Sequence, residues 1–151
     1  MSFGISIIKN PVYIWDQRRE CNVIDWNESQ GDYNLEFEFD YNDFSALQNF
    51  IDIKLSPAKQ REGENYPEYE ERLKNEYLDG AKDKGYEMLG RIWYWYESVC
   101  YLPSEINRLF QECVNVKNDN QNLKQVAAIE KLIFACKEAK KIKSGIFLGS
   151  D

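Results

Sequence analysis

Residues 33–40 constrain the fold more than any other segment, because apolar and acidic side chains alternate along them. The apolar residues are Leu35, Phe37 and Phe39. The acids that alternate with them are Glu36, Glu38 and Asp40. Successive side chains of a β-strand point to opposite faces of its sheet, so this alternation predicts a strand with one buried and one solvated face. Such a strand needs a neighbouring strand and an apolar layer that covers it.

Two shorter segments earlier in the chain also favour strands. Residues 3–8 are mostly apolar and end at the turn-forming pair Asn10-Pro11, and residues 12–15 form a second short apolar run. Residues 16–31 are polar and show no regular period, so we predict an irregular connection there.

Apolar residues recur at helical spacing in five later segments. The first is predicted to start behind a cap at Asn42 or Asp43. The second starts near Pro67, which suits a first helical turn. The fourth is predicted to be capped by Ser104, and the fifth spans about 122–143.

The third of these segments, residues 86–102, is the most ambiguous. Aromatic residues occupy every side of its central run at 93–96, which predicts the most buried helix of the protein, ended by Pro103. A strand is the alternative for this segment, because aromatic residues also favour strands. The same aromatic run could line a ligand cage, although core packing is the simpler interpretation.

These patterns together predict an α+β fold in a single globular domain over residues 1–151. We expect a small N-terminal antiparallel sheet, followed by a region of four to five helices packed on it. The expected division is a strand-rich part at 1–41, a helical part at 42–143 and a short tail at 144–151. No internal repeat or domain boundary is visible in the 151 residues.

The chain contains no histidine, which excludes several kinds of active site. It can form neither a Ser-His-Asp nor a Cys-His nucleophile system, and it offers no imidazole ligand to a metal. Its four cysteines, at 21, 100, 113 and 136, include no closely spaced pair of the kind found in zinc sites. Glycine-rich phosphate-binding motifs are also missing. We therefore predict a protein that is not an enzyme and that uses no metal or cofactor.

The net charge of −7 is concentrated in the first third of the chain. Residues 1–52 contain ten acids and three bases, whereas residues 104–151 contain six acids and eight bases. This acidic balance argues against binding to nucleic acid phosphates. Aromatic residues lie among the acids, and this combination is suited to binding a basic protein, because acids steer the encounter and aromatics supply contact energy. The predicted partner-binding residues are Asp16, Glu20, Asp25, Trp26, Glu28, Asp32, Tyr33, Glu36, Glu38, Asp40 and Asp43.

Three other interpretations of these acids and of the helical half stay open. In the first, the acids only solvate one face of the sheet, as in any half-buried strand. Clustered carboxylates could alternatively hold a divalent cation or act as an acid and base, as in a metal-dependent hydrolase or a glycosidase. The helical half could also serve as the surface of a scaffold or adaptor subunit.

The first ten residues lack the basic start and long apolar run of a signal peptide, and no apolar stretch approaches the roughly 20 residues that span a bilayer. We therefore expect a protein without membrane association that stays in the cytoplasm, where thiols remain reduced.

In overall character the chain resembles the bacterial immunity proteins of polymorphic-toxin and contact-dependent growth inhibition systems. The shared features are small size, acidity, abundant tryptophan and tyrosine, and no catalytic motif. In that class an acidic surface typically blocks the basic active site of a cognate nuclease toxin. The resemblance therefore implies a non-enzymatic toxin inhibitor, and because it rests on no motif, it assigns no residue a role.

Overall fold

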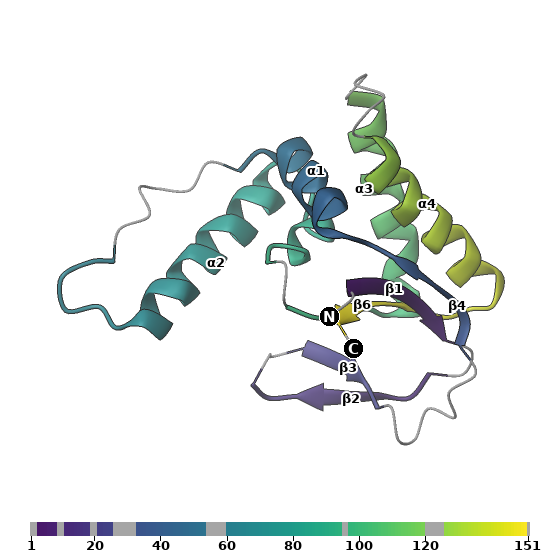
Figure 1. Cartoon of the computed structure of the whole chain (residues 1–151), viewed down its shortest axis with the longest axis horizontal. Helices are drawn as coiled ribbons and strands as arrows, with labels where there is room; N and C mark the ends of the chain where they lie inside the picture. The colour runs from purple at the N-terminus through teal and green to yellow at the C-terminus, as the bar shows by residue number, and fades with distance from the viewer. Residues whose placement is uncertain are drawn as a thin grey trace.

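The computed structural model describes residues 3–8, 11–18, 21–25, 33–53, 60–94, 97–119 and 126–150 (Figure 1). The strands are β1 (Phe3–Ile8), β2 (Tyr13–Asp16), β3 (Cys21–Ile24), β4 (Tyr33–Glu38), β5 (Val99–Tyr101) and β6 (Ile146–Ser150). The α-helices are α1 (Tyr41–Ile51), α2 (Tyr66–Asp83), α3 (Ile106–Asp119) and α4 (Val126–Lys141). Two short 3₁₀ turns are η1 (Leu89–Arg91) and η2 (Pro103–Glu105).

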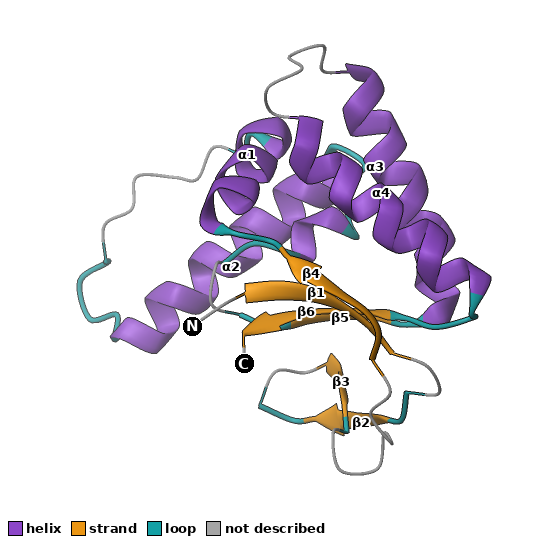
Figure 2. Ribbon diagram, turned by 45° about the vertical axis from the view of Figure 1, so that its right-hand side comes forward, coloured by secondary structure: helices purple, strands orange, loops and turns teal. Residues whose placement is uncertain are grey.

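An antiparallel four-stranded sheet in the order β4-β1-β6-β5 organises the fold. Ile5 at its centre pairs with Phe37 of β4 on one side and with Leu148 of β6 on the other. The helices lie on one face of this sheet, and the β2–β3 hairpin lies on the opposite side (Figure 2). This arrangement confirms the predicted α+β class, with β1 and β4 where the apolar patterns predicted strands.

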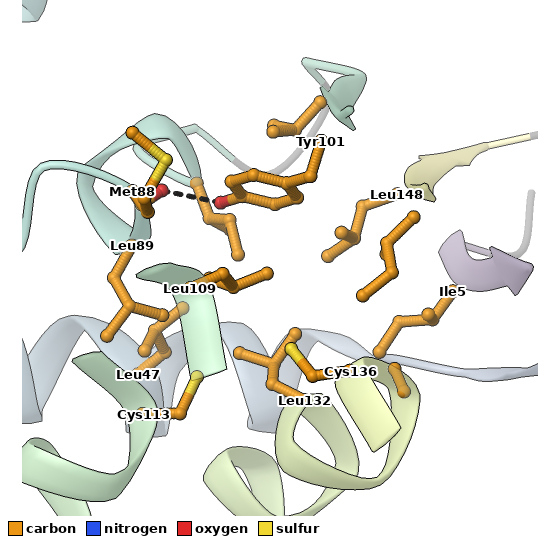
Figure 3. Close-up of a cluster of buried hydrophobic side chains, with 14 of the residues drawn as sticks. Ile5, Leu47, Met88, Leu89, Tyr101, Leu109, Cys113, Leu132, Cys136 and Leu148 are labelled. Atoms are coloured by element: carbon orange, nitrogen blue, oxygen red, sulfur yellow. Dashed lines mark hydrogen bonds between the residues drawn. The ribbon is translucent and has the colours of Figure 1, made fainter. Parts of the chain in front are cut away.

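The main core fills the space between the sheet and the helices. Ile5 and Leu148 of the sheet face Leu109 of α3 and Leu132 of α4, all fully buried (Figure 3). The hydroxyl of the buried Tyr101 donates a hydrogen bond of 2.6 Å to the carbonyl of Met88, so the one polar atom of this ring is satisfied. Burial of such aromatic and aliphatic side chains is the main force that holds the two layers together.

Two cysteines of this core behave as apolar residues. Cys113 of α3 and Cys136 of α4 are almost fully buried. Burial raises the pKa of the Cys136 thiol to about 12 and raises that of Cys113 as well, so both stay protonated at neutral pH. Both thiols are therefore inert, because only a thiolate is nucleophilic.

The helix predicted over residues 86–102 does not form, and this prediction is wrong. Gly85 has φ +86° and turns the chain after α2, and η1 and then β5 follow at the sheet edge. The carboxylate of Glu112 on α3 accepts the backbone N–H groups of Met88, at 2.9 and 3.1 Å, and Leu89, at 3.0 Å. Those donors are therefore satisfied by a distant side chain rather than by a helix. The alternative of a strand is correct for β5.

The segment predicted as a short tail also has a different role. Residues 146–150 form β6, which lies in the sheet between β1 and β5. Gly145 precedes it, at a point where a Cβ atom would collide with the carbonyl oxygen of Tyr101 and the hydroxyl of Tyr13. The predicted irregular segment at 16–31 likewise contains a strand, β3.

Candidate partner-binding surfaces

The face of the sheet away from the helices carries the two acids that the alternation of β4 predicted to be solvated. Glu36 and Glu38 are exposed on β4, opposite Ser6 and Gly4 of β1. Among the described residues neither carboxylate has a salt-bridge partner. We call this side of the sheet, together with the β2–β3 hairpin that lies on it, the outer face. Its described acids and its exposed aromatic residue are Trp15, Asp16, Asp25, Glu36 and Glu38.

The hairpin joins the outer face through a small apolar cluster of its own. Ile24 of β3 and Ile8, Cys100 and Phe147 of the sheet form this cluster, and Tyr13 of β2 packs against it. Burial raises the pKa of the Tyr13 hydroxyl to about 12, helped by the nearby Cys100. The cluster fixes the hairpin on the part of the sheet formed by β1, β6 and β5.

The hairpin leaves two large apolar side chains of β2 in water, one on each of its faces, because successive strand residues point to opposite sides. Trp15 is 59% exposed and Ile14 is 47% exposed. Asp16 and Asp25 are half-buried, and the carboxylate of Asp16 accepts the backbone N–H of Arg18 at 2.9 Å. The structure therefore places a tryptophan on the same side of the sheet as Glu36 and Glu38.

Asp40 and Asp43, also predicted to contact a partner, stabilise the start of α1. Each side chain accepts the backbone N–H of the other residue at 2.9 Å, which is a reciprocal capping box. The Nζ of Lys131, 88 positions further along the chain, lies 2.6 Å from the carboxylate of the buried Asp43. The helix cap is thus Asp40 rather than Asn42 or Asp43, and both acids already have partners within the fold.

The remaining predicted residues are described in part or not at all. Glu20, Trp26, Glu28 and Asp32 lie outside the described residues. The backbone of Tyr33 belongs to β4 and pairs with Ile8. Within the described ranges, no three His, Cys, Asp or Glu side chains come together in the manner of metal ligands.

A second surface feature lies between α1 and α2, on the helical side of the protein. It is a groove of about 490 Å³ that aromatic side chains dominate. Its lining comes from three places: one face of α2, the end of α1 with the residues that follow it, and the pair Trp93 and Tyr94 after η1. The lining residues are Gln48, Asn49, Asp52, Ile53, Tyr66, Tyr69, Glu70, Leu73, Tyr77, Trp93 and Tyr94.

One side-chain amide connects the elements that line the groove. Gln48 of α1 accepts the hydroxyl proton of Tyr77 at 2.5 Å and donates its own N–H to the carbonyl of Ile92 at 2.6 Å. Burial raises the pKa of the Tyr77 hydroxyl, so the phenol remains a donor across the physiological range. Because the amide links α1, α2 and the residue after η1, the groove is fixed before any ligand arrives.

The bases near the groove have partners within the fold, and two of them also lie over rings that line it. Arg72 lies over Tyr69, at 5.4 Å from the ring centroid, and Lys74 lies over Trp93, at 5.8 Å. Arg72 lies 3.0 Å from Glu64, and this hydrogen bond lowers the pKa of the Glu64 carboxyl. The Nζ of Lys74 lies 2.8 Å from Glu97, and the Nζ of Lys84 binds the backbone carbonyls of Ile51 and Asp52.

Unlike these bases, the two acids that line the groove form no ion pair with any residue that the structure describes. In the described part of the chain, no base lies within salt-bridge distance of the carboxylates of Asp52 and Glu70. The groove therefore combines aromatic walls with two carboxylates that form no ion pair among the described residues, and no lysine or arginine is among its lining residues.

The sequence contained signals for parts of this groove but not for its assembly. The repeated spacing of Tyr69, Leu73 and Tyr77 predicted one helix face, and the aromatic run at 93–96 was considered as a ligand cage. Trp93 and Tyr94 of that run do line the groove, while residues 95 and 96 lie outside the described residues. Only the fold shows that these segments meet the end of α1.

Comparisons of the chain with known protein families, with curated protein sequences and with solved structures found no match. Among the helices that the structure describes, none combines the length and the apolar character needed to cross a lipid bilayer.

Proposed function

We propose that this protein is a non-enzymatic binding module that recognises a basic protein partner through its outer face. The observation that carries the proposal is the 59% exposed Trp15 on the same side of the sheet as the exposed Glu36 and Glu38. Tryptophan is enriched among residues that dominate binding energy at protein interfaces. Acids that lack internal partners remain available to attract a basic surface over distances of about 10 Å.

The class of partner that fits this surface best is a basic toxin domain, such as a nuclease. A protein that binds nucleic acid presents a basic site, and a compact acidic protein can occupy that site in place of the phosphates. In this proposal the protein is an immunity protein that acts in the cytoplasm, binds neither nucleic acid nor membranes, and needs no cofactor.

A capture experiment with paired charge reversals tests the proposal. The outer-face variant is Glu36→Lys with Glu38→Lys, and the charge-matched control is Glu62→Lys with Glu71→Lys, two exposed acids elsewhere. Each full-length protein is immobilised, exposed to a lysate of the cell that encodes it, and the retained proteins are quantified by mass spectrometry. We expect the wild type and the control to retain the same basic protein, and the outer-face variant to retain about tenfold less of it.

Asp40 and Asp43 are left unchanged in this design, because reversing either would also remove the cap of α1. The retained protein is then expressed alone and together with the wild-type chain, and growth is measured. Growth inhibition that co-expression relieves supports a toxin inhibitor. Equal retention by all three proteins, or equal loss from both variants, would show that the outer face does not select the partner.

A further inference from the structure

We propose that the groove between α1 and α2 binds an arginine side chain carried by a polypeptide segment. This inference is independent of the proposed outer-face function, because the groove lies on the helical side of the protein. It rests on three properties of the groove: its aromatic walls, a lining that contains two acids and no base, and its size.

The aromatic walls are accessible to a ligand. Tyr66 is 64% exposed and Tyr94 is 44% exposed, although large aromatic side chains gain free energy when they are covered. The rings of Tyr66 and Tyr69 have centroids 6.2 Å apart, and those of Trp93 and Tyr94 are 5.3 Å apart. The faces of such rings attract cations, and most strongly in the case of tryptophan.

The charge of the groove favours a cation at the same place. Asp52 is the C-cap of α1, so the groove includes the end of that helix, where Lys84 partly offsets the negative end of the helix dipole by binding the carbonyls of Ile51 and Asp52. The carboxylate of Asp52 adds to this field, and that of Glu70 joins it from α2. A cation that enters the groove therefore meets two carboxylates without an ion-pair partner among the described residues, as well as the aromatic faces.

Arginine fits this combination better than lysine does. A guanidinium is planar, stacks on aromatic rings and donates paired hydrogen bonds to a carboxylate, whereas an ammonium is compact and strongly hydrated. The protein itself shows the arrangement twice. The guanidinium of Arg72 lies 5.4 Å from the centroid of Tyr69 while it bonds to Glu64, and that of Arg91 lies 5.6 Å from the centroid of Tyr101 while it bonds to Glu105. Arg72 does not line the groove, and although Arg72 and Lys74 lie over the rings of Tyr69 and Trp93, Glu70 and the exposed rings of Tyr66 and Tyr94 remain for a second guanidinium.

The size of the groove points to a polypeptide segment. Its volume of about 490 Å³ falls in the range of roughly 300–1,000 Å³ typical of pockets for drug-sized ligands, which exceeds the need of one side chain. The groove also follows α2 from Tyr66 to Tyr77, about three helical turns. A short extended segment can lie along this face and insert its arginine between the aromatic pairs.

Nuclear magnetic resonance with a defined peptide tests the proposal. The probe is acetyl-Ala-Arg-Ala-Arg-Ala-amide, and its control is the same peptide with citrulline, the neutral analogue, at both arginines. Titrated into the full ¹⁵N-labelled protein, the arginine peptide should shift the Trp93 indole resonance and the backbone signals of 48–53 and 66–73. The Trp15 indole should not move, and the citrulline peptide should bind at least about tenfold more weakly.

Matched variants locate the site. Asp52→Asn with Glu70→Gln should weaken peptide binding by about tenfold or more, because both substitutions keep the shape and remove the charge. Asparagine is also tolerated in the left-handed conformation of residue 52. Glu71→Gln, one position along α2 and outside the groove, should change the affinity by less than about twofold. Tyr66→Ala, which removes an exposed ring, is an independent test and should weaken binding by about threefold or more.

Several results would overturn the inference. These are peptide-induced shifts confined to Glu36 and Glu38, equal weakening by Glu71→Gln and by Asp52→Asn with Glu70→Gln, or equal affinity for the matching lysine peptide. Equal affinity for methylguanidinium alone would show a site for a small cation instead of a polypeptide. The outer-face variant should bind the arginine peptide within about threefold of the wild type, so failure here and failure of the outer face can be told apart.

Discussion

Replacing Glu112 with alanine should lower the free energy of unfolding by about 3 kcal/mol, because two buried backbone N–H groups would lose their acceptor. Glu112 is only 5% exposed, and its carboxylate accepts the N–H groups of Met88 and Leu89. These bonds hold the turn between α2 and β5 that replaces the helix predicted there. Urea unfolding followed by circular dichroism measures the effect, provided the slope with denaturant is unchanged.

Two control substitutions show how this result is to be interpreted. Glu112→Gln keeps the oxygen that accepts both N–H groups, so it should cost about 1 kcal/mol. Glu130→Ala removes a carboxylate of α4 that is 58% exposed and lies 3.4 Å from Lys117, and it should change stability by less than about 0.5 kcal/mol. If Glu112→Ala were no more destabilising than Glu130→Ala, the turn would not depend on this carboxylate.

The same residue predicts a pH dependence. Burial raises the pKa of the Glu112 carboxyl above its ordinary value, against the opposing effect of its backbone hydrogen bonds and Arg108. In the folded protein the carboxyl thus keeps its proton to a higher pH than in the unfolded chain, so this contribution to stability is largest at acidic pH. The stability of the wild type relative to Glu112→Gln should therefore fall as pH rises from about 4 towards 7, as urea unfolding at each pH can measure. A difference that grows with pH would contradict the burial effect.

Replacing Gly145 with alanine should also be strongly destabilising, by about 3 kcal/mol. The added methyl group would lie inside the contact distance of the Tyr101 carbonyl and the Tyr13 hydroxyl. The first atom is backbone of β5, so it can move only if the sheet edge moves. Urea unfolding followed by circular dichroism tests this expectation.

Gly63→Ala is the matched control for this substitution. Gly63 has φ +77° and no atom within 4 Å of a new Cβ, so alanine there adds backbone strain without a collision and should cost about 1 kcal/mol. Equal stability of Gly145→Ala and the wild type would mean that β5, β6 and the hairpin do not approach each other as closely as described.

The sequence predicted the elements whose signal is local and periodic. The strand at β4 shows strict alternation, and the stripe of Leu47 and Ile51 on α1 is buried as its helical spacing predicted. The failures have a common physical cause. Residues 86–102 depend on Glu112 to satisfy backbone donors, and β6 is a five-residue apolar strand between two others, which has no distinctive period.

The same distinction between local signals and contacts of distant residues applies to the candidate surfaces. Exposure of Glu36 and Glu38 could be predicted, since it depends only on the alternation of one strand. The roles of Asp40 and Asp43 could not be assigned fully, because Asp43 meets a lysine on a helix far along the chain. A capping box is nevertheless readable as two acids three positions apart, and that signal was missed. The groove needed the fold, since its walls come from segments more than 40 residues apart, as the bond between Gln48 and Ile92 shows.

The most direct measurement for the proposed function is the association rate of the captured basic partner at several ionic strengths. If the outer face steers the encounter, the wild-type rate should fall steeply as salt is added, because screening shortens the range of the acids. The variant Glu36→Lys with Glu38→Lys should associate about tenfold more slowly at low salt and depend little on ionic strength. Equal rates and equal salt dependence for the wild type and this variant would contradict an outer face that recognises a basic partner.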